Sequence, residues 1–377
     1  MLDHLLTPLG WDDAWAAALA AHARTADART ADAPDAYNDP AADHPMPARV
    51  CRADREACDV LIPTSEGLAP ITATWSGALQ RAQRADPTAA PVTGDWVVTS
   101  APTSDRVVVD GVLPRRSAVV RAQVDGSSRG QVLAANADIA AVVEGLFPDP
   151  DPGRIERLLA LAWASGARPV VLLTKADLVD DPQAITDDVA RLAPGAEVVA
   201  TSATDGSGLA ELREWLASGA TIALLGASGV GKSTLLNALT GGDARTRALR
   251  ADGKGRHTTV TRELHLIPGG GAILDTPGLR TIGLAGADWL DDVFPEVEEL
   301  ATGCRFADCE HRTEPDCAVR AAIEAGDLPE RRLDSYRKLL REVQHQAARS
   351  DARLRAEMTQ VWKQREKDYR KKPNRKV

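Results

Sequence analysis

The stretch Gly226-Ala227-Ser228-Gly229-Val230-Gly231-Lys232-Ser233-Thr234 has the spacing GxxxxGKS followed by threonine. It follows the apolar run 220–225 and precedes 235–239, a segment typical of a helix. A strand, a glycine-rich loop and a helix in this order form the setting in which the motif binds phosphate, because converging backbone amides and the helix N-terminus attract an anion. We therefore predict a phosphate-binding loop, in which Lys232 reaches the outer phosphates and the Ser233 hydroxyl coordinates Mg²⁺. A glycine turn that binds nothing would not need this lysine and serine.

Length and composition favour a chain of several domains. The chain has 377 residues, of which 44% are apolar, enough for two or three packed cores. No run approaches the roughly 18 apolar residues of a membrane helix, and the N-terminal residues lack the basic segment of a secretion signal. Three of the five cysteines lie between 304 and 317, which favours metal binding in a reducing compartment over disulfides. We expect a cytoplasmic protein without a membrane partner.

Charge is distributed unevenly along the chain. The net charge is −9, but residues 330–377 carry 16 Lys and Arg against 7 Asp and Glu. This segment therefore has a net charge of +9 and the remainder about −18. A basic end favours contact with nucleic-acid phosphates, whereas the acidic remainder disfavours it.

The N-terminal third predicts an extension followed by a small β-barrel. Residues 1–47 indicate a short helix near 11–24 and then a disordered linker. Residues 48–130 contain five short β-type segments broken by Gly and Pro, typical of an oligonucleotide-binding (OB-like) or an SH3-like barrel. These segments are 49–52, 59–62, 71–75, 95–98 and 106–109. We interpret Cys51 and Cys58 as buried or free thiols, and Arg115-Arg116 as part of a solvated loop.

Between 131 and 285 β-type segments alternate with amphipathic helices. This alternation predicts a parallel sheet covered by helices on both faces, with ligands bound beyond the carboxyl ends of the strands. The expected strands are 139–143, 169–173, 197–200, 220–225 and 272–274, and the expected helices are 154–163, 184–192, 209–216 and 235–239.

Two segments at strand ends resemble the base-recognition loops of GTPases. Thr174-Lys175-Ala176-Asp177 has the form [N/T]KxD, with Thr174 where most GTPases have asparagine. The Asp177 carboxylate would accept hydrogen bonds from the guanine ring N–H and amino group, which adenine cannot donate, and Lys175 would lie along the base. Thr201-Ser202-Ala203 follows the next strand and resembles the second base-contacting loop. We assign Thr174, Lys175, Asp177, Ser202 and Ala203 to nucleotide binding.

Two other segments resemble the switch loops. Asp275-Thr276-Pro277-Gly278 closes the apolar strand 272–274, about 40 residues after the phosphate-binding loop. Asp275 would hold Mg²⁺ through a water and the Gly278 amide would meet the terminal phosphate; an ordinary turn is the alternative. Upstream, Gly253-Lys254-Gly255-Arg256-His257-Thr258-Thr259 looks like the other switch. Either Thr258 or Thr259 would complete the Mg²⁺ shell.

The order of these motifs indicates a circular permutation. Ordinary GTPases place the base motif after the phosphate-binding loop, whereas here it begins at 174 and the phosphate-binding loop at 226. The same pocket can still assemble, because neighbours in a sheet need not be neighbours in sequence. The second switch then lies at the end of the domain, close to the next module.

Leu279 predicts slow intrinsic hydrolysis. It follows Gly278, where many GTPases carry the glutamine that orients the attacking water, and leucine cannot do so. A partner or another group must therefore help. His257 is our candidate catalytic residue in this chain, since it lies on a switch segment that could reach the water; a solvated loop histidine is the alternative.

The pattern Cys304-x4-Cys309-x-His311-x5-Cys317 supplies three thiolates and one imidazole within 14 residues. Four such ligands suit a closed, tetrahedral, structural Zn²⁺ site. Because the segment is polar and short, the metal would be what folds it. Residues 333–361 then predict one or more basic amphipathic helices, and the tail 363–376 favours contact with RNA phosphates.

Taken together, these motifs closely resemble the bacterial ribosome-small-subunit-dependent GTPase A (YjeQ/RsgA) family over about residues 48–345. The hydrophobic residue after DTPG, the switch histidine and the zinc ligands of that family match Leu279, His257 and the cluster 304–317. The resemblance implies a GTPase that binds the small ribosomal subunit and its rRNA, is stimulated by it and acts late in its maturation. Mg²⁺ with GTP and one structural Zn²⁺ would be its cofactors.

The expected domains are an N-terminal extension (1–47), an OB-like barrel (48–130), a circularly permuted α/β GTPase domain (131–285) and a zinc-binding helical domain with a basic tail (286–377). We expect a monomer, in which GTP closes both switches and fixes the barrel and the zinc module at the angle that fits rRNA. The alternatives are a permuted GTPase acting on the large subunit or another RNA, and an RNA placeholder or chaperone with negligible turnover.

Overall fold

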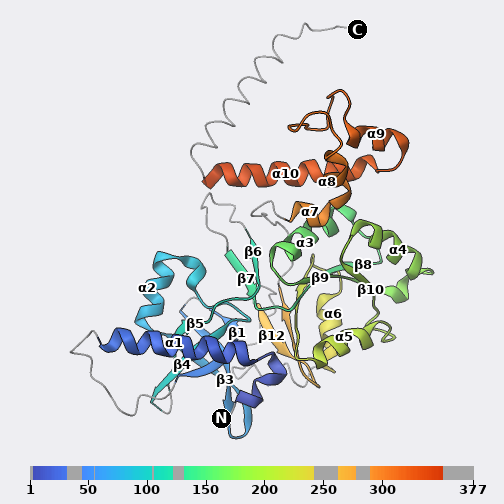
Figure 1. The fold of residues 1–377 in the computed structure, drawn as a ribbon. Helices are drawn as coiled ribbons and strands as arrows, with labels where there is room; N and C mark the ends of the chain where they lie inside the picture. Colours follow the sequence, from blue (N-terminus) through green and yellow to red (C-terminus); the bar gives the residue numbers. More distant parts are fainter. Residues whose placement is uncertain are drawn as a thin grey trace. The chain divides into compact units, whose positions relative to one another are not determined.

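The computed structural model describes residues 3–31, 45–54, 56–103, 106–121, 131–241, 262–276 and 289–350. The chain divides into two compact units. The first comprises Met1–Val120 and Val132–Thr281, and the second Arg121–Gln131 and Ile282–Val377. The first holds a barrel and an α/β sheet, and the second a group of helices near the C-terminal end (Figure 1).

The barrel is built from five strands, as the sequence predicts. The strands are β1 (Met46–Ala53), β2 (Ala57–Thr64), β3 (Gly67–Trp75), β4 (Trp96–Thr103) and β5 (Arg106–Val112). They pair in the order β1-β2-β3-β5-β4, and β4 pairs back onto β1, which closes the barrel. Its core includes Val50, Val60, Trp75 and Val97. Helix α2 (Gly77–Ala85) begins at Ser76, whose Oγ accepts a hydrogen bond from the Leu79 N–H at 3.3 Å.

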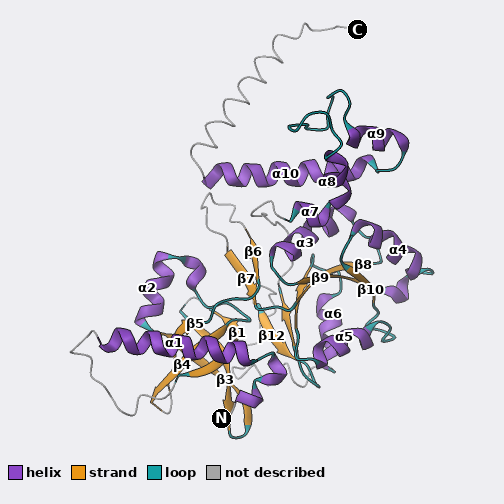
Figure 2. Ribbon diagram, in the orientation of Figure 1, coloured by secondary structure: helices purple, strands orange, loops and turns teal. Residues whose placement is uncertain are grey.

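The α/β sheet alternates strands and helices in the predicted order. Its elements are β8 (Ile139–Gly145), α3 (Pro152–Ala164), β9 (Arg168–Thr174), α4 (Pro182–Leu192), β10 (Glu197–Ala200), α5 (Leu209–Ala217), β11 (Thr221–Leu225), α6 (Lys232–Thr240), β12 (Glu263–Leu266) and β13 (Ala272–Asp275). Strands β10-β9-β8-β11-β13 are parallel, so their carboxyl ends meet at one edge (Figure 2). Short turns of 3-10 helix are Asp3–Leu5, Thr7–Leu9, Pro87–Ala89 and Ala176–Leu178, and β6 (Ala118–Arg121) pairs with β7 (Gln131–Ala135).

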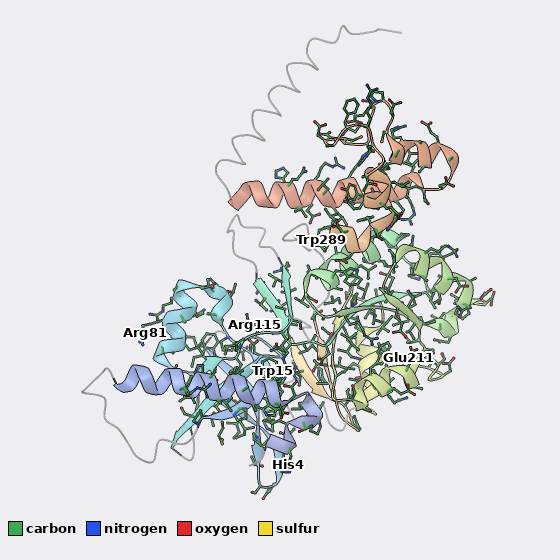
Figure 3. The ribbon with its side chains drawn as sticks, viewed as in Figure 1. His4, Trp15, Arg81, Arg115, Glu211 and Trp289 are labelled. Atoms are coloured by element: carbon green, nitrogen blue, oxygen red, sulfur yellow. The ribbon has the colours of Figure 1, made fainter. Side chains whose placement is uncertain are left out.

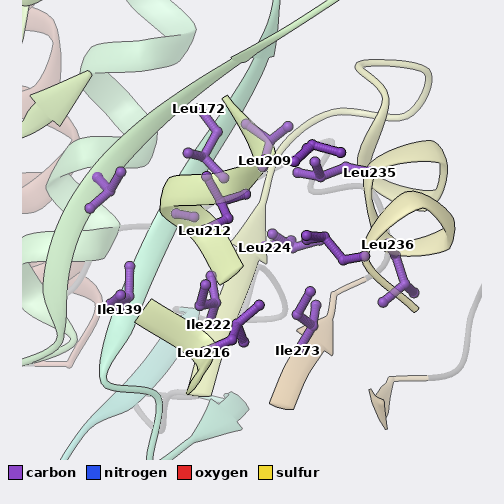
Figure 4. Close-up of a cluster of buried hydrophobic side chains, with 14 of the residues drawn as sticks. Ile139, Leu172, Leu209, Leu212, Leu216, Ile222, Leu224, Leu235, Leu236 and Ile273 are labelled. Atoms are coloured by element: carbon purple, nitrogen blue, oxygen red, sulfur yellow. The ribbon is translucent and has the colours of Figure 1, made fainter. Parts of the chain in front are cut away.

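One face of the α/β sheet carries a large apolar core. Ile222 and Leu224 of β11 pack with Leu212 of α5 and with Leu235 and Leu236 of α6 (Figure 4). Side chains alternate between the faces of a strand, so every second residue of β11 contributes to this core. The core fixes β11 and α6, which flank the phosphate-binding loop.

Strand β12 departs from the predicted all-parallel sheet. It pairs antiparallel with β13, with Leu264 opposite Leu274. The connection between them runs through Gly269, Gly270 and Gly271, all with positive φ, and so short a link allows only a hairpin. On its other side β12 pairs with β1 through Arg52 and Glu263, so barrel and α/β sheet form one eleven-stranded sheet.

Arg49 of β1 lies at the junction between barrel and α/β sheet, almost completely buried. Its Nε donates to Gly94 O at 3.1 Å, and its Nη2 donates to Asn136 O at 2.9 Å and to Thr221 Oγ1 at 3.1 Å. Its Nη1 donates to Leu9 O. One guanidinium therefore joins the barrel, the N-terminal segment and the start of β11.

The N-terminal segment packs onto the first unit. Helix α1 (Asp13–Ala31) is longer than the predicted helix near 11–24, and the residues after it up to 44 lie outside the described part. Trp11 and Trp15 are buried, and the ring of Trp11 lies edge-on to Trp96 with centroids 4.8 Å apart. The Gly271 N–H donates to Pro8 O at 2.7 Å. The segment thus contacts both the barrel and the β12–β13 hairpin.

Arg115 and Arg116 both form ion pairs that the sequence did not indicate, and only Arg116 is exposed to solvent as expected. Arg115 forms a two-bond ion pair with the buried Asp95, at 2.8 and 2.7 Å. Arg116 bonds both carboxylate oxygens of Asp12 at 2.6 Å and lies 4.2 Å from the centre of the Trp15 ring; Figure 3 labels Arg115 and Trp15. Their carboxylate partners are 20 and 104 residues away in sequence, so local composition could not reveal the pairs.

The regular elements of the second unit between residues 289 and 350 are helices. It contains α7 (Leu290–Val293), α8 (Pro295–Ala301), α9 (Ala318–Ala325) and α10 (Glu330–Ser350). Arg332 of α10 is buried, donates to Glu296 at 2.5 Å and to Val293 O at 2.8 Å, and lies over the ring of Phe294. None of the helices among the described residues is both long and apolar enough to cross a membrane.

Candidate functional site

The phosphate-binding loop leaves β11 at Gly226 and enters α6 at Lys232. A Cβ at Gly226 would lie 2.5 Å from Val143 O, so only glycine lets the loop pass β8 at this distance. Gly231 has φ of 103° and is the residue before α6, a conformation that other residues adopt only under strain. The sequence motif thus has the strand, turn and helix N-terminus that it requires.

Lys232 is turned back onto its own loop. Its Nζ donates to Gly226 O at 2.8 Å and to Ala227 O at 2.7 Å. Burial lowers the pKa of Lys232, while the charges of Asp275 and Glu144 oppose the shift. A cation held among backbone carbonyls and helix-end amides is placed to meet an incoming anion.

Asp275 ends β13 beside this lysine. Burial raises its pKa, and the positive charge of Lys232 opposes that shift. The next residue, Thr276, is buried and donates from Oγ1 to Leu224 O at 2.5 Å. The start of the DTPG segment is therefore fixed to the strand that precedes the phosphate-binding loop.

Thr174 links the base motif to the phosphate-binding loop. Its Oγ1 donates to Val230 O and also lies 3.3 Å from Glu144 O. A Cβ at Gly231 would come within 2.9 Å of Thr174 Oγ1. The threonine found in place of asparagine therefore has a polar contact to the loop, and a larger side chain at 231 would displace it.

Asp177 is held by the second base loop. Ser202 Oγ donates to Asp177 Oδ1 at 2.7 Å and accepts from the N–H groups of Thr204 and Asp205 at 3.1 and 3.3 Å. Because those amides use the lone pairs of the hydroxyl, its hydrogen is directed to the carboxylate. Lys175 has φ of 64°, and its Nζ donates to Phe147 O at 3.0 Å.

These segments share one cavity of about 810 Å³. Its volume lies within the range of roughly 300 to 1,000 Å³ typical of small-molecule sites. The cavity is lined by Thr174, Lys175, Asp177, Leu178, Thr201, Ala203, Thr204, Ser228, Gly229, Gly231, Lys232, Ser233, Thr234, Leu235, Asp275 and Thr276. The base motif, the phosphate-binding loop and the DTPG segment thus meet despite their permuted order.

Several predicted residues lie outside the described part of the chain, namely His257, Thr258, Thr259, Gly278 and Leu279. Among the described residues, Gly226, Ala227, Val230 and Ser202 belong to the loops around the cavity without lining it. Five lining residues were not assigned to binding from the sequence, namely Leu178, Thr201, Thr204, Leu235 and Thr276. Each lies within a recognised motif or directly after one, which is the signal that could have found them.

The cysteine and histidine cluster assembles in the second unit. The candidate ligand atoms of Cys304, Cys309, His311 and Cys317 all lie within 4.8 Å of one another. His311 Nδ1 is 3.5 Å from the sulfurs of Cys304 and Cys317, and these sulfurs are 3.8 Å apart. A tetrahedral site with Zn–S of about 2.3 Å and Zn–N of about 2.0 Å requires about 3.8 Å between sulfurs and about 3.6 Å between sulfur and nitrogen. The cluster therefore fits Zn²⁺.

Local hydrogen bonds shape the loop that carries these ligands. The Glu314 carboxylate accepts from the backbone N–H groups of Arg312, Thr313 and Glu310 at 2.6, 2.9 and 3.2 Å. Arg337 of α10 donates to His311 O. Cys317 is the residue before α9, so the last ligand is positioned by the start of a helix.

A phosphate-binding loop and a base motif of the form TKAD in one cavity, on a parallel sheet whose motifs follow in permuted order, define a circularly permuted P-loop GTPase. Residues 112–285 match the model of the RsgA GTPase family. The "Small ribosomal subunit biogenesis GTPase RsgA" of Streptomyces avermitilis is 48% identical over 373 residues, which cover 96% of this chain and 92% of that protein. The chain therefore belongs to the RsgA GTPase family.

Other similar proteins agree with this assignment. The protein of the same name from Streptomyces coelicolor is 48% identical over 366 residues, covering 96% of this chain and 92% of its own. The crystal structure of YjeQ from Thermotoga maritima is 27% identical with a TM-score of 0.56, covering 79% of this chain and 98% of that chain. The similarity to the Streptomyces proteins extends beyond 48–345, because 96% of the chain is covered.

Proposed function

We propose that the protein binds a guanine nucleotide in the 810 Å³ cavity, hydrolyses GTP there and acts in biogenesis of the small ribosomal subunit. The observation that carries this proposal is the meeting of Asp177, Lys232 and Asp275 at one cavity, although they are distant in sequence. Family membership supports the reaction, and the names of the relatives support the ribosomal process.

The phosphates would lie on the phosphate-binding loop, where the backbone amides of 228–234 and the N-terminus of α6 provide an anion site. Lys232 would exchange its two carbonyl partners for phosphate oxygens. Ser233 and Asp275 line the cavity and offer oxygen ligands for Mg²⁺, with Thr258 or Thr259 completing the shell. When bound, Mg²⁺ would neutralise charge on the phosphate oxygens.

The base would lie against Lys175 and bond to Asp177, with Ser202 and Ala203 in the second loop. Ser202 keeps one carboxylate oxygen of Asp177 hydrogen-bonded at 2.7 Å, which orients the other toward the ligand. A carboxylate accepting hydrogen bonds from the base selects guanine over adenine, because adenine would leave the oxygen that faces the ligand unpaired at a cost of roughly 1–3 kcal/mol.

Hydrolysis would be slow without a partner, because Leu279 cannot orient water. His257 would take over this role, and the Gly278 amide would contact the terminal phosphate. The small ribosomal subunit is the proposed stimulating partner, contacted through its rRNA by the basic end of the chain. We place the protein in the cytoplasm as a monomer, with the four domains bounded at 47, 130 and 285.

The test is GTP turnover with and without purified small or large ribosomal subunits. Stimulation by small subunits supports the proposal. Stimulation by large subunits alone contradicts it and favours a GTPase that acts on the large subunit, and negligible turnover in both cases contradicts it and favours an RNA placeholder or chaperone. Lys232→Ala should abolish turnover, and Asp177→Asn should reduce the preference for guanine over adenine nucleotides. Efficient use of ATP by the unaltered protein would contradict the assignment of the base site.

A further inference from the structure

Glu144 is a buried carboxylate at the ligand-binding edge of the sheet. Glu144 is the sixth residue of β8, and only 3% of its surface is exposed to solvent. None of the sequence motifs includes it. A buried charge is costly unless it is paired, so its surroundings must supply a partner.

Arg154 supplies that partner. Its Nε donates to Glu144 Oε2 at 2.6 Å and its Nη2 to Oε1 at 2.7 Å, so both carboxylate oxygens are bonded. Arg154 lies in the first turn of α3, where Asp151 accepts its backbone N–H at 3.1 Å. The start of α3 therefore places the guanidinium, which bonds Glu144 in a two-bond geometry and also lies 3.4 Å from a carboxylate oxygen of Asp151.

The backbone of Glu144 lies beside the phosphate-binding loop. Strands β8 and β11 pair in parallel with Val142 opposite Leu225, so Glu144 comes two residues beyond the last paired position, level with the start of the loop. The Glu144 carbonyl lies 3.3 Å from Thr174 Oγ1, which also donates to Val230 O of the loop. Glu144 acts electrostatically on Lys232, the lysine of the loop.

We propose that Arg154 sets the affinity of the cavity for nucleotide phosphates by neutralising Glu144 next to the phosphate-binding loop. Without this arginine the carboxylate would repel the phosphates and compete with them for Lys232. This inference rests on the proposed nucleotide site. It makes Arg154 a positioning and charge-balancing residue rather than one that contacts the substrate.

A charge effect differs measurably from a purely structural one. Repulsion between a carboxylate and a ligand increases with the charge of the ligand, so it should be large for GTP, smaller for GDP and absent for guanosine. If the substitution instead distorted the phosphate-binding loop, the binding of all three ligands would be weakened. Removing the charges of both Glu144 and Arg154 should restore GTP binding if repulsion is the cause. It should not restore GTP binding if the two side chains act only through their packing.

The experiment measures affinity for GTP, GDP and guanosine by calorimetry at pH 8 in low salt, where screening is weak. Arg154→Met should weaken GTP binding by about tenfold and guanosine binding by less than about twofold. The double variant Glu144→Gln with Arg154→Met should bind GTP within about twofold of the unaltered protein. Arg168→Met is the matched control, since it removes an Arg–Glu197 pair at the opposite end of the same sheet.

Equal losses for GTP and guanosine, or no rescue in the double variant, would overturn this proposal while leaving the nucleotide site intact. If the unaltered protein binds none of the guanine ligands, the nucleotide site itself is wrong, and this inference falls with it. Thermal unfolding of each variant shows whether Arg154→Met is folded. The double variant restores charge balance without the ion pair, so it tests the proposal even if the single variant is unstable.

Discussion

Arg49 of the barrel donates a hydrogen bond of 3.1 Å to the hydroxyl of Thr221, the first residue of the strand that leads to the phosphate-binding loop. The same guanidinium bonds three backbone carbonyls, and it lies 4.8 Å from the centre of the Trp96 ring. The barrel and the nucleotide-binding sheet are therefore tied by one buried side chain as well as by the pairing of β1 with β12.

Arg49→Met should destabilise the protein strongly. The substitution leaves the buried carbonyls of Leu9 and Asn136 without the guanidinium donor, and unsatisfied buried groups cost roughly 1–3 kcal/mol each. We expect a loss of about 3 kcal/mol or more in the free energy of unfolding, measured by urea titration of tryptophan fluorescence. The control is Arg52→Met on the same strand, which removes an exposed pair with Asp54 and should cost less than about 1 kcal/mol. A similar small loss for both variants would contradict the role of Arg49.

This connection changes the interpretation of how the nucleotide could act on the rest of the protein. The sequence suggested a barrel and a zinc module both set at an angle by GTP. A continuous eleven-stranded sheet and the Arg49 contacts make the barrel part of the same compact unit as the nucleotide cavity. A barrel swinging freely against the nucleotide domain would have to break these contacts.

The contact of Asp12 with Arg116 should make docking of the N-terminal segment depend on pH. The hydrogen bonds from Arg116 lower the pKa of Asp12 to about 2, below its ordinary value of 3.8. A carboxyl with a depressed folded pKa contributes stability above its unfolded pKa, and this contribution is lost as the pH falls through the folded value.

Asp12→Asn should therefore be less stable than the unaltered protein at pH 7, by no more than about 1 kcal/mol because the pair is largely exposed. The difference should shrink from about pH 4 downward and vanish only below about pH 2, in urea titrations at each pH. Asparagine can still cap α1, where Asp12 accepts the Trp15 N–H at 3.0 Å. A difference that stays constant with pH would exclude the ion pair as its source.

Gly231→Ala should abolish nucleotide binding, whereas Gly229→Ala should reduce it much less. Both glycines have positive φ, at 103° and 85°, so both variants carry backbone strain of roughly 1 kcal/mol. Only at 231 would the new Cβ also approach Thr174 Oγ1, to 2.9 Å, whereas at 229 nothing lies within 4 Å. Calorimetry with GDP compares them; equal losses would show that strain alone matters and that the Thr174 contact does not.

Short motifs indicated residues that meet at one cavity, because spacing in a loop determines which backbone groups converge. The sequence indicated the phosphate-binding loop, Asp177 and Asp275, and these residues do lie at one cavity. The barrel strands were also indicated by short β-type segments, although β3 extends through Pro70 to Gly67 and so begins before the predicted 71–75. In each case the signal is carried by residues adjacent in sequence.

Contacts between distant segments could not be predicted in this way. Strand β12 has only four residues, and its position is fixed by pairing with a strand on each side, β13 and β1. Glu144 gave no signal within its apolar strand, because its partner Arg154 belongs to the next helix. Such pairs depend on the tertiary structure, and the hydrophobic periodicity of the sequence carries no information on which distant residues meet.

Ser202→Ala should weaken the binding of guanine nucleotides by about tenfold, since it removes the 2.7 Å hydrogen bond that orients Asp177. Selectivity for guanine over adenine should fall as well, because a freely rotating carboxylate reads the base less well. Ser218→Ala is the matched control, since this exposed serine bonds only Trp215 O of its own helix end. Affinities for GDP and ADP measure the effect, and unchanged selectivity in Ser202→Ala would argue against the base-site assignment.

Zinc should be bound at one ion per chain and should hold the loop 304–317 in shape. Cys317→Ser removes one of four ligands, so we expect loss of the bound metal in elemental analysis and faster tryptic cleavage at Arg305 and Arg312. Treating the unaltered protein with a strong chelator should produce the same cleavage, because the polar loop has little core of its own. Cys58→Ala serves as the control, since this thiol is buried in the barrel core and its pKa is raised to about 12 by burial. In the described part of the chain, only residues 304, 309, 311 and 317 form a group whose ligand atoms all lie within 4.8 Å of one another. Retention of a full equivalent of zinc by Cys317→Ser, or loss of zinc from Cys58→Ala, would therefore show that this cluster is not the metal site.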